Sequence, residues 1–265
     1  MPDDTYTHGH HASVLRSHTW RTAENSAAYL LPHLRPGMAL LDVGCGPGTI
    51  TADLARIVAP GEVRGLDRSE AVVAQAAEAA AGPGNVSFAT GDVYAIDAPD
   101  AAYDVVHAHQ VLQHLSDPVA ALAEMRRVCR PGGLVAVRDS DYGAFTWAPA
   151  DPDLDDWLDV YRAVARGNGA EPDAGRHLKA WAIAAGSSHV DASASVWCFS
   201  DDEDRAWWGG LWADRVEQSD LARQAVDGGF ATAADLARFA AAFRRWAAAP
   251  DGWFAVLHGE VLARP

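Results

Sequence analysis

A glycine-rich segment at residues 40–48, with the sequence LLDVGCGPG, constrains the fold of this chain more than any other feature. It ends a short apolar run and precedes an amphipathic one, which predicts a buried strand that turns sharply into a helix. Glycine permits such a turn and lets the backbone approach a ligand closely, and the first turn of a helix presents N–H groups without intrahelical partners. We therefore expect a nucleotide-binding crevice at the carboxyl end of this strand.

Short apolar runs alternate with Ala-rich amphipathic segments between Met38 and about Asp139. Continuous apolar runs are typical of strands buried on both faces of a parallel sheet. The runs are MALLDV, EVRGLD, VSFAT, DVVHAH and GLVAVRD, and the helices expected between them cover residues 48–58, 69–81 and 117–129. The link 91–103 is short and contains proline, so at most a stunted helix is expected there. This alternation predicts a doubly wound α/β sheet.

The flanking segments follow a less regular pattern. A helix is expected over residues 13–34, and after Asp139 the pattern predicts helices at 153–166, 176–185, 203–226 and 232–248 and strands at 190–199 and 253–262. A chain of 265 residues without a low-complexity linker is expected to form one domain. Its expected parts are an N-terminal lid and helix (1–37), a ligand-binding core (38–140) and a remainder (141–265) with helical substrate-capping insertions at about 141–189 and 200–250.

The formal net charge of −15 restricts the partners. Phosphate backbones and anionic membranes repel an acidic surface, so neither nucleic acid nor membrane is expected as a partner. No apolar stretch approaches the roughly 18 residues that span a bilayer, and the N-terminus lacks a secretory signal, so we expect a cytoplasmic protein. Three scattered cysteines and the N-terminal His8, His10 and His11 do not supply a fixed ligand set, and no metal is expected.

The spacing of the glycines distinguishes between nucleotide-binding loops. Asp42, Gly44, Gly46 and Gly48 satisfy D-x-G-x-G-x-G, whereas Thr49 stands where the third glycine of a dinucleotide fingerprint would be. The segment resembles the first motif of class I S-adenosylmethionine-dependent methyltransferases. In that family this loop, which here includes Cys45, surrounds the methionine end and the ribose of the cofactor.

Three further motifs over residues 38–139 strengthen the resemblance. Asp67, followed by Arg68, ends the second strand, where a carboxylate accepts hydrogen bonds from both ribose hydroxyls. Gly91-Asp92-Val93 follows the third strand, and in similar enzymes the acid holds the adenine amino group. The fourth strand with its exit loop at 103–115 and the Pro-Gly-Gly turn at 131–133 complete the order. The nearest resemblance is to the small-molecule methyltransferases of the ubiquinone/menaquinone-biosynthesis type and their relatives in secondary metabolism.

The resemblance implies a seven-stranded, mostly parallel Rossmann-like sheet whose last two strands form an antiparallel edge. It also implies methyl transfer from S-adenosyl-L-methionine, leaving S-adenosyl-L-homocysteine, to O, N or C of a small organic acceptor, by a monomer or homodimer. Two alternatives stay open: a protein that binds this cofactor without transferring methyl, and an NAD-dependent oxidoreductase, which Thr49 and Asp92 oppose. The acidic composition beside a cationic sulfonium favours a neutral or cationic apolar acceptor.

Candidate catalytic residues follow the strands whose ends face the cofactor's methyl group. The candidates for a general base are His109, His114 and Asp141, with the alternative that each is only a hydrogen-bonded loop residue. The resemblance implies that His109 and the neighbouring Gln110 also contact the cofactor.

Candidate substrate residues come from both ends of the chain. Tyr6, His18 and Trp20 belong to the expected N-terminal lid, Tyr142 follows the fifth strand, and Trp208 and Trp212 share one face of an expected helix. Packing of the tryptophans in the core of a helical layer is the alternative to a substrate wall.

Overall fold

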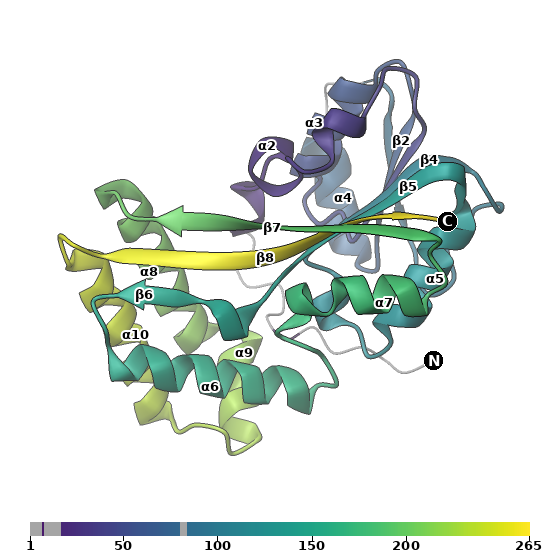
Figure 1. Cartoon of the computed structure of the whole chain (residues 1–265). Helices are drawn as coiled ribbons and strands as arrows, with labels where there is room; N and C mark the ends of the chain where they lie inside the picture. The colour runs from purple at the N-terminus through teal and green to yellow at the C-terminus, as the bar shows by residue number, and fades with distance from the viewer. Residues whose placement is uncertain (1–6, 8–16, 80–83) are drawn as a thin grey trace.

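One sheet organises the molecule, in a computed structural model that describes residues 7, 17–79 and 84–265 (Figure 1). The strand order is β3-β2-β1-β4-β5-β8-β6, with β7 paired to β8. Five strands pair in parallel: β1 (Leu40–Val43), β2 (Val63–Asp67), β3 (Val86–Thr90), β4 (Tyr103–His109) and β5 (Cys129–Ser140). The doubly wound, mostly parallel sheet expected from the sequence is confirmed.

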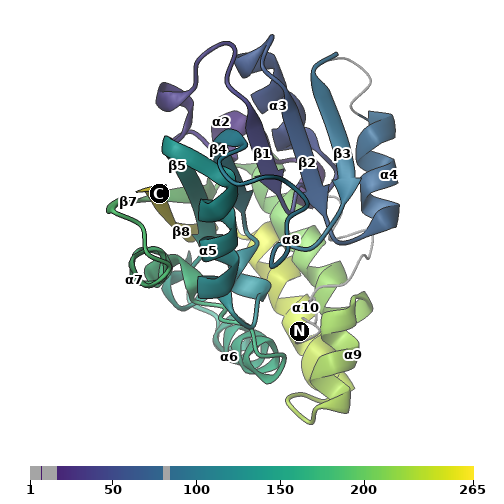
Figure 2. The ribbon, with the colours of Figure 1, turned by 90° about the vertical axis from the view of Figure 1, so that its right-hand side faces the viewer.

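Helices cover both faces of the parallel strands, which explains the continuous apolar runs (Figure 2). Leu40 and Val105 face a core shared with α2 (Ala23–Ser26) and α3 (Thr49–Val58). Leu41 and Val106, the next residues of the same strands, face the opposite core, with α5 (Pro118–Val128) and α7 (Leu178–Ala184). Successive strand residues point to opposite faces, so neither face is left to solvent. Helix α4 (Glu70–Ala79) packs on β3 and β2.

One expectation in the N-terminal part of the chain is corrected. The single helix expected over 13–34 is wrong for its described part, which forms a helical turn at 17–19, then α2, then a 3-10 turn, η1 (Leu31–His33). Thr22 starts α2 with a capping box, and Pro32 occupies the first turn of η1, so both act as element starts inside the expected helix. The link 91–103 contains an isolated bridge between Asp92 and Ala95 and no helix, which is within the expectation of at most a stunted one.

The last strand, β8 (Trp253–Arg264), is twelve residues long and joins the two halves of the molecule. Its C-terminal half runs antiparallel to β5, and its N-terminal half pairs with β6 (Thr146–Ala148), which continues the track of β5 after the turn η3 (Tyr142–Ala144). β7 (His189–Phe199) runs antiparallel along the whole of β8. The described sheet therefore has eight strands where seven were expected, the addition being β6.

A helical layer packs under the projecting ends of β6, β7 and β8 (Figures 1 and 2). Its helices are α6 (Pro152–Gly167), α8 (Asp202–Gln218), α9 (Asp220–Asp227) and α10 (Ala233–Ala248). The helix expected over 203–226 is interrupted at Ser219, whose backbone is extended and whose hydroxyl donates to the carbonyl of Arg215. Among the residues that the structure describes, no helix is long and apolar enough to cross a membrane.

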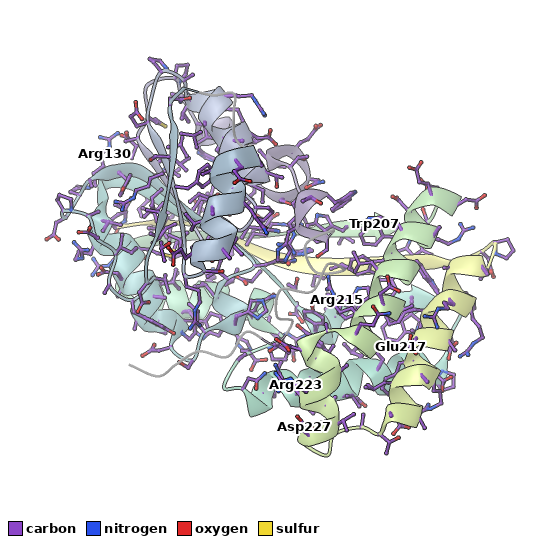
Figure 3. The ribbon with its side chains drawn as sticks, turned by 180° about the vertical axis from the view of Figure 1, so that it is seen from behind. Arg130, Trp207, Arg215, Glu217, Arg223 and Asp227 are labelled. Atoms are coloured by element: carbon purple, nitrogen blue, oxygen red, sulfur yellow. The ribbon has the colours of Figure 1, made fainter. Side chains whose placement is uncertain are left out.

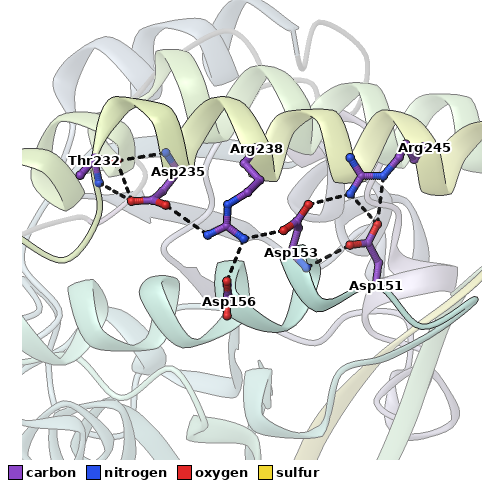
Figure 4. A network of polar contacts seen from close by, with 7 residues as sticks. All are labelled: Asp151, Asp153, Asp156, Thr232, Asp235, Arg238 and Arg245. Carbon is purple, nitrogen blue, oxygen red and sulfur yellow. Dashed lines mark hydrogen bonds and ion pairs between the residues drawn. The ribbon is translucent and has the colours of Figure 1, made fainter.

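Ion pairs hold α10 against α6 at the surface of this layer (Figure 4). Arg238 of α10 pairs with Asp153 and Asp156 of α6, and Arg245 pairs with Asp151 and Asp153. The hydrogen bonds from the two arginines lower the pKa of the Asp153 carboxyl.

Candidate active site

A cavity of ≈ 790 Å³ extends from the glycine-rich loop to the helical layer. One end is formed by residues at the carboxyl ends of β1, β2, β3 and β4, and the other by side chains of α8, α9, β7 and the described N-terminal residues. Its size falls within the range of ligand pockets, and its place at the strand ends is where open α/β sheets bind ligands.

The glycine-rich loop requires glycine at two positions for steric reasons. Gly44 has a φ of +65°, and a Cβ there would lie 2.3 Å from a methyl of Val111. Gly48 has a φ of +80°, and a Cβ there would lie 2.8 Å from the Phe88 ring. The N–H of Cys45 donates to the carbonyl of Leu66, which fixes the loop to β2. Burial raises the pKa of the Cys45 thiol well above its usual range, so this cysteine is not a thiolate nucleophile.

Two carboxylates brace this end of the cavity. Asp67 accepts hydrogen bonds from the N–H groups of Gly46 (3.1 Å) and Ser69 (3.0 Å). Asp42 lies beneath the loop with both oxygens engaged, one with Nδ1 of His107 at 2.7 Å and the other with the Thr51 hydroxyl at 2.5 Å. Asp42 therefore supports the glycine-rich loop, and Asp67 lies at the cavity between that loop and the start of α4.

The structure brings the residues expected at the cofactor together at one end of the cavity. Asp92, whose carboxylate accepts the N–H of Tyr94, lies there at the end of β3. Gly48 is the exception, since it does not line the cavity. The expected residues that do line it are Asp42, Gly44, Cys45, Gly46, Asp67, Arg68, Gly91, Asp92, Val93, His109 and Gln110.

Gln110 connects the two ends of the cavity. Its φ of +54° is unusual for a residue with a side chain, and such strain persists where surrounding contacts hold it. Arg21 donates to its Oε1 at 2.5 Å, and its Nε2 lies 2.8 Å from both the Ser140 hydroxyl and Nε2 of His258. Sequence reasoning gave His258 no role, because 148 residues separate it from Gln110 and no local pattern reports such a contact.

His109 presents an uncommitted imidazole at the cavity. The residue is buried, and among the described residues neither ring nitrogen has a hydrogen-bond partner. Burial, with the charges of Arg21 and Arg138, lowers the pKa of this imidazole well below its ordinary value, so it is neutral near pH 7. The ring lies beside Trp197, with centroids 5.7 Å apart.

The other candidate bases are placed differently. His114 lines the cavity, but its Nε2 lies 3.0 Å from Nε2 of Gln113, and burial lowers its pKa to about 3. Asp141 does not line the cavity, and Arg176 donates to both of its oxygens, at 2.6 and 2.5 Å. The cavity thus contains His109 and His114, while the Asp141 carboxylate is engaged elsewhere.

The expected substrate residues converge from distant parts of the chain. Tyr6 lies outside the described residues. Those that line the cavity are His18, Trp20, Tyr142, Trp208 and Trp212. Trp208 and Trp212 are also 4% and 1% exposed members of the apolar core of the helical layer. Trp208 and Trp212 therefore pack in the core of the helical layer and also line the cavity, because this core extends to the cavity wall.

Arg215 is a cavity residue that the sequence analysis missed. It lies on α8 and is buried, with its guanidinium 4.6 Å from the centre of the Trp212 ring and a nitrogen 2.9 Å from the Ser17 hydroxyl. Its spacing of three from Trp212 and seven from Trp208 was the available signal, since it places all three on one helix face. In the described part of the chain no group of three or more His, Cys, Asp or Glu is arranged for a metal ion, and His8, His10 and His11 lie outside that part.

Comparisons with known proteins agree with this arrangement. Residues 34–190 match the family model of a methyltransferase domain. An uncharacterized methyltransferase of Schizosaccharomyces pombe is 37% identical over 97% of this chain and 95% of its own length. The demethylmenaquinone methyltransferase of Staphylococcus aureus is 39% identical, over 38% of this chain and 43% of its own, so the quinone-type resemblance is partial.

Solved structures share the fold at lower identity. The YcgJ protein of a Bacillus species superposes with a TM-score of 0.59 at 21% identity, covering 91% of this chain and 98% of that one. A phosphoethanolamine N-methyltransferase of Haemonchus contortus, solved with S-adenosylhomocysteine, gives 0.58 at 16% identity, covering 91% and 52%. The chain therefore belongs to the methyltransferase-domain family, and it shares its fold with the methyltransferase solved with S-adenosylhomocysteine.

Proposed function

We propose that this protein transfers a methyl group from S-adenosylmethionine to O, N or C of a small organic acceptor bound against its aromatic wall. The observation that carries the proposal is a single cavity that runs from the glycine-rich loop to Trp208 and Trp212. Methyl transfer is an in-line displacement, so cofactor and acceptor must lie end to end in a space that excludes water. The cavity meets that requirement, with the glycine-rich loop at one end, here called the nucleotide-type end, and Trp208 and Trp212 at the other, here called the acceptor end.

The residues at the nucleotide-type end fit an adenosine-containing cofactor. The loop backbone approaches its ligand without side chains at Gly44 and Gly46, and Asp67 presents a carboxylate for the ribose hydroxyls. In this proposal Asp92 and Val93, which line the cavity, contact the adenine ring, and Arg21 binds the carboxylate at the methionine end of the cofactor. When bound, this cofactor supplies an electrophilic methyl group on a sulfonium.

The residues at the acceptor end position the acceptor and remove its proton. Trp20, Trp208 and Trp212 provide flat apolar surfaces that exclude water. His109, neutral and with uncommitted nitrogens, accepts the proton that an oxygen or nitrogen nucleophile loses. His114, whose Nε2 lies 3.0 Å from Nε2 of Gln113, contributes to the shape of the loop.

Cofactor binding is tested with Asp67→Asn. S-Adenosylhomocysteine binding measured by calorimetry is expected to weaken about tenfold to a hundredfold, because hydrogen bonds from two hydroxyls to a charged carboxylate are lost. Asp191→Asn, on an exposed part of β7, is the matched control and is expected to bind as the wild type does. Unchanged binding by Asp67→Asn would remove Asp67 from the proposed site.

The nature of the cofactor is tested by thermal shift. S-Adenosylhomocysteine is expected to raise the Tm of the wild type and NAD to leave it unchanged. Stabilisation by NAD alone would overturn the proposal. Stabilisation by S-adenosylhomocysteine, with no methyl ever transferred from labelled cofactor to a panel of phenols, quinones, amines and acids, would instead favour cofactor binding without methyl transfer.

The role of His109 is tested with His109→Asn on any acceptor that the panel identifies. The expected result is a fall in kcat of about 100-fold to 10,000-fold, with the affinity for S-adenosylhomocysteine within a few fold of wild type. An unchanged kcat would show that the acceptor loses its proton without this imidazole.

A further inference from the structure

Arg215 introduces a buried positive charge at the acceptor end of the cavity. It lies on the inner side of α8, between the sheet and the helical layer, whereas Arg223 lies further along on α9 (Figure 3). Its side chain stacks on the Trp212 ring and donates to the Ser17 hydroxyl, so both a core aromatic and the described N-terminal segment fix its position. A guanidinium held in this way is a preorganised donor with a planar fork.

A second donor belongs to another residue of the same cavity wall. Trp208 lines the cavity and is 4% exposed, and its indole N–H has no hydrogen-bond partner among the described residues. Indole N–H groups that are buried usually find an acceptor. Trp208 lies seven residues before Arg215 on the same helix, so the two side chains occupy one face of α8.

Most of the charged side chains described at this end are cationic. The charges that affect the buried groups around this end are mainly positive. Burial raises the pKa of Tyr142, and the positive charges of Arg215 and Arg21 act in the opposite direction. Arg21 adds to the effect of burial in lowering the pKa of His114, and Arg21 and Arg138 do so for His258. The carboxylates Asp42, Asp67 and Asp92 lie at the opposite, nucleotide-type end, and Asp220, a carboxylate of α9 at the acceptor end, pairs with Arg223, which also lines the cavity.

We propose that the acceptor is an aromatic molecule carrying a carboxylate, which Arg215 and the Trp208 N–H bind while Tyr142 and Trp212 contact its flat part. This inference rests on the proposed function and names its substrate class. A carboxylate matches the guanidinium fork in geometry and charge, and an aromatic ring matches the wall beside it. The acidic net charge suggested a neutral or cationic acceptor, but it describes the whole surface, whereas Arg215 acts inside the cavity.

The test compares matched acids and amides on protein saturated with S-adenosylhomocysteine. Hydroxybenzoate, hydroxycinnamate and hydroxynaphthoate are titrated beside the corresponding neutral amides, with calorimetry as the readout. For the wild type at low salt, the best acid is expected to bind about tenfold or more tightly than its amide. Amides that bind as well as the acids, or the absence of binding by every acid at millimolar concentration, would overturn the inference.

Variants assign the preference to Arg215. Arg215→Met keeps the apolar stem and is expected to reduce the acid-to-amide affinity ratio to about one, and Arg215→Lys is expected to restore part of it. Arg244→Met is the control, since Arg244 on α10 is exposed, pairs with Glu217 and does not line the cavity. An Arg215→Met variant that keeps the acid preference would also contradict the inference.

The affinity for S-adenosylhomocysteine separates this inference from the proposed function. It is expected to stay within a few fold of wild type in all three variants, because Arg215 lies at the acceptor end. If the wild type failed to bind S-adenosylhomocysteine, the proposed function would fail. If it bound the cofactor product but showed no acid preference, only the acceptor class would be wrong.

Discussion

Asp139 is a residue whose ionisation opposes folding. It lies one residue before the end of β5 in a fully buried position, where one oxygen accepts the N–H of Gln113 at 3.1 Å and the other has no partner among the described residues. Burial raises its pKa from 3.8 to about 7. Between about pH 4 and pH 7 the carboxyl is therefore ionised in the unfolded chain and protonated in the folded one. Because the folded state binds the extra proton, the contribution of Asp139 to stability is lost as pH rises through this window.

Asp139→Asn is expected to remove this loss while keeping the hydrogen bond from Gln113. Relative to wild type, the free energy of unfolding of the variant should rise between pH 4 and pH 7, by at most about 4 kcal/mol. Urea unfolding of both proteins across this range measures the difference between their free energies of unfolding. Both proteins contain the same buried histidines, so the titration of these histidines cancels in the difference. A constant difference between the two proteins at all pH values would mean that Asp139 titrates normally.

At the scale of elements, the sequence predicted what is encoded locally. The turn from β1 to α3 depends on glycines within one short segment, and the apolar runs of the parallel strands depend on burial of both faces, so both were predicted. The interruption at Ser219 and the short strand β6 were not predicted, because each depends on packing against β8 and neighbouring helices. His258 and Arg215 were not predicted as site residues either, because their contacts at the site depend on the tertiary arrangement.

The ion pairs between α6 and α10 are expected to add little stability, and only at low salt. Arg238→Met removes the pairs with Asp153 and Asp156 and should lower the Tm by less than about 4 °C, a difference that disappears in high salt. Calorimetric scans at low and high salt measure it. Arg223→Met, which removes pairs within α9 alone, is the comparison. A large, salt-independent fall for Arg238→Met would show that its stem, and not its charge, holds the helices together.

For the whole molecule, β8 determines whether the two halves unfold together. The strand pairs with β5 of the parallel sheet through its C-terminal half, and its N-terminal half carries Phe254 into the helical layer. Phe254 is fully buried, with its ring centroid 5.4 Å from that of Trp147, 5.6 Å from Trp246 and 5.9 Å from Trp208. The cavity lies between these halves, so its geometry depends on the same strand.

Phe254→Ala is expected to lower the free energy of unfolding by about 3–5 kcal/mol, as deletion of a buried ring does in other cores. Most of the ten tryptophans lie in the helical layer, so their fluorescence reports its unfolding, while hydrogen exchange of the β1 and β4 amides reports the parallel sheet. Because β8 belongs to both, the two probes should shift together in urea, and S-adenosylhomocysteine should stabilise both equally. A shift of the fluorescence transition without a shift in hydrogen exchange would mean that the helical layer unfolds independently of the parallel sheet. Cofactor binding would then persist at urea concentrations at which acceptor binding is lost.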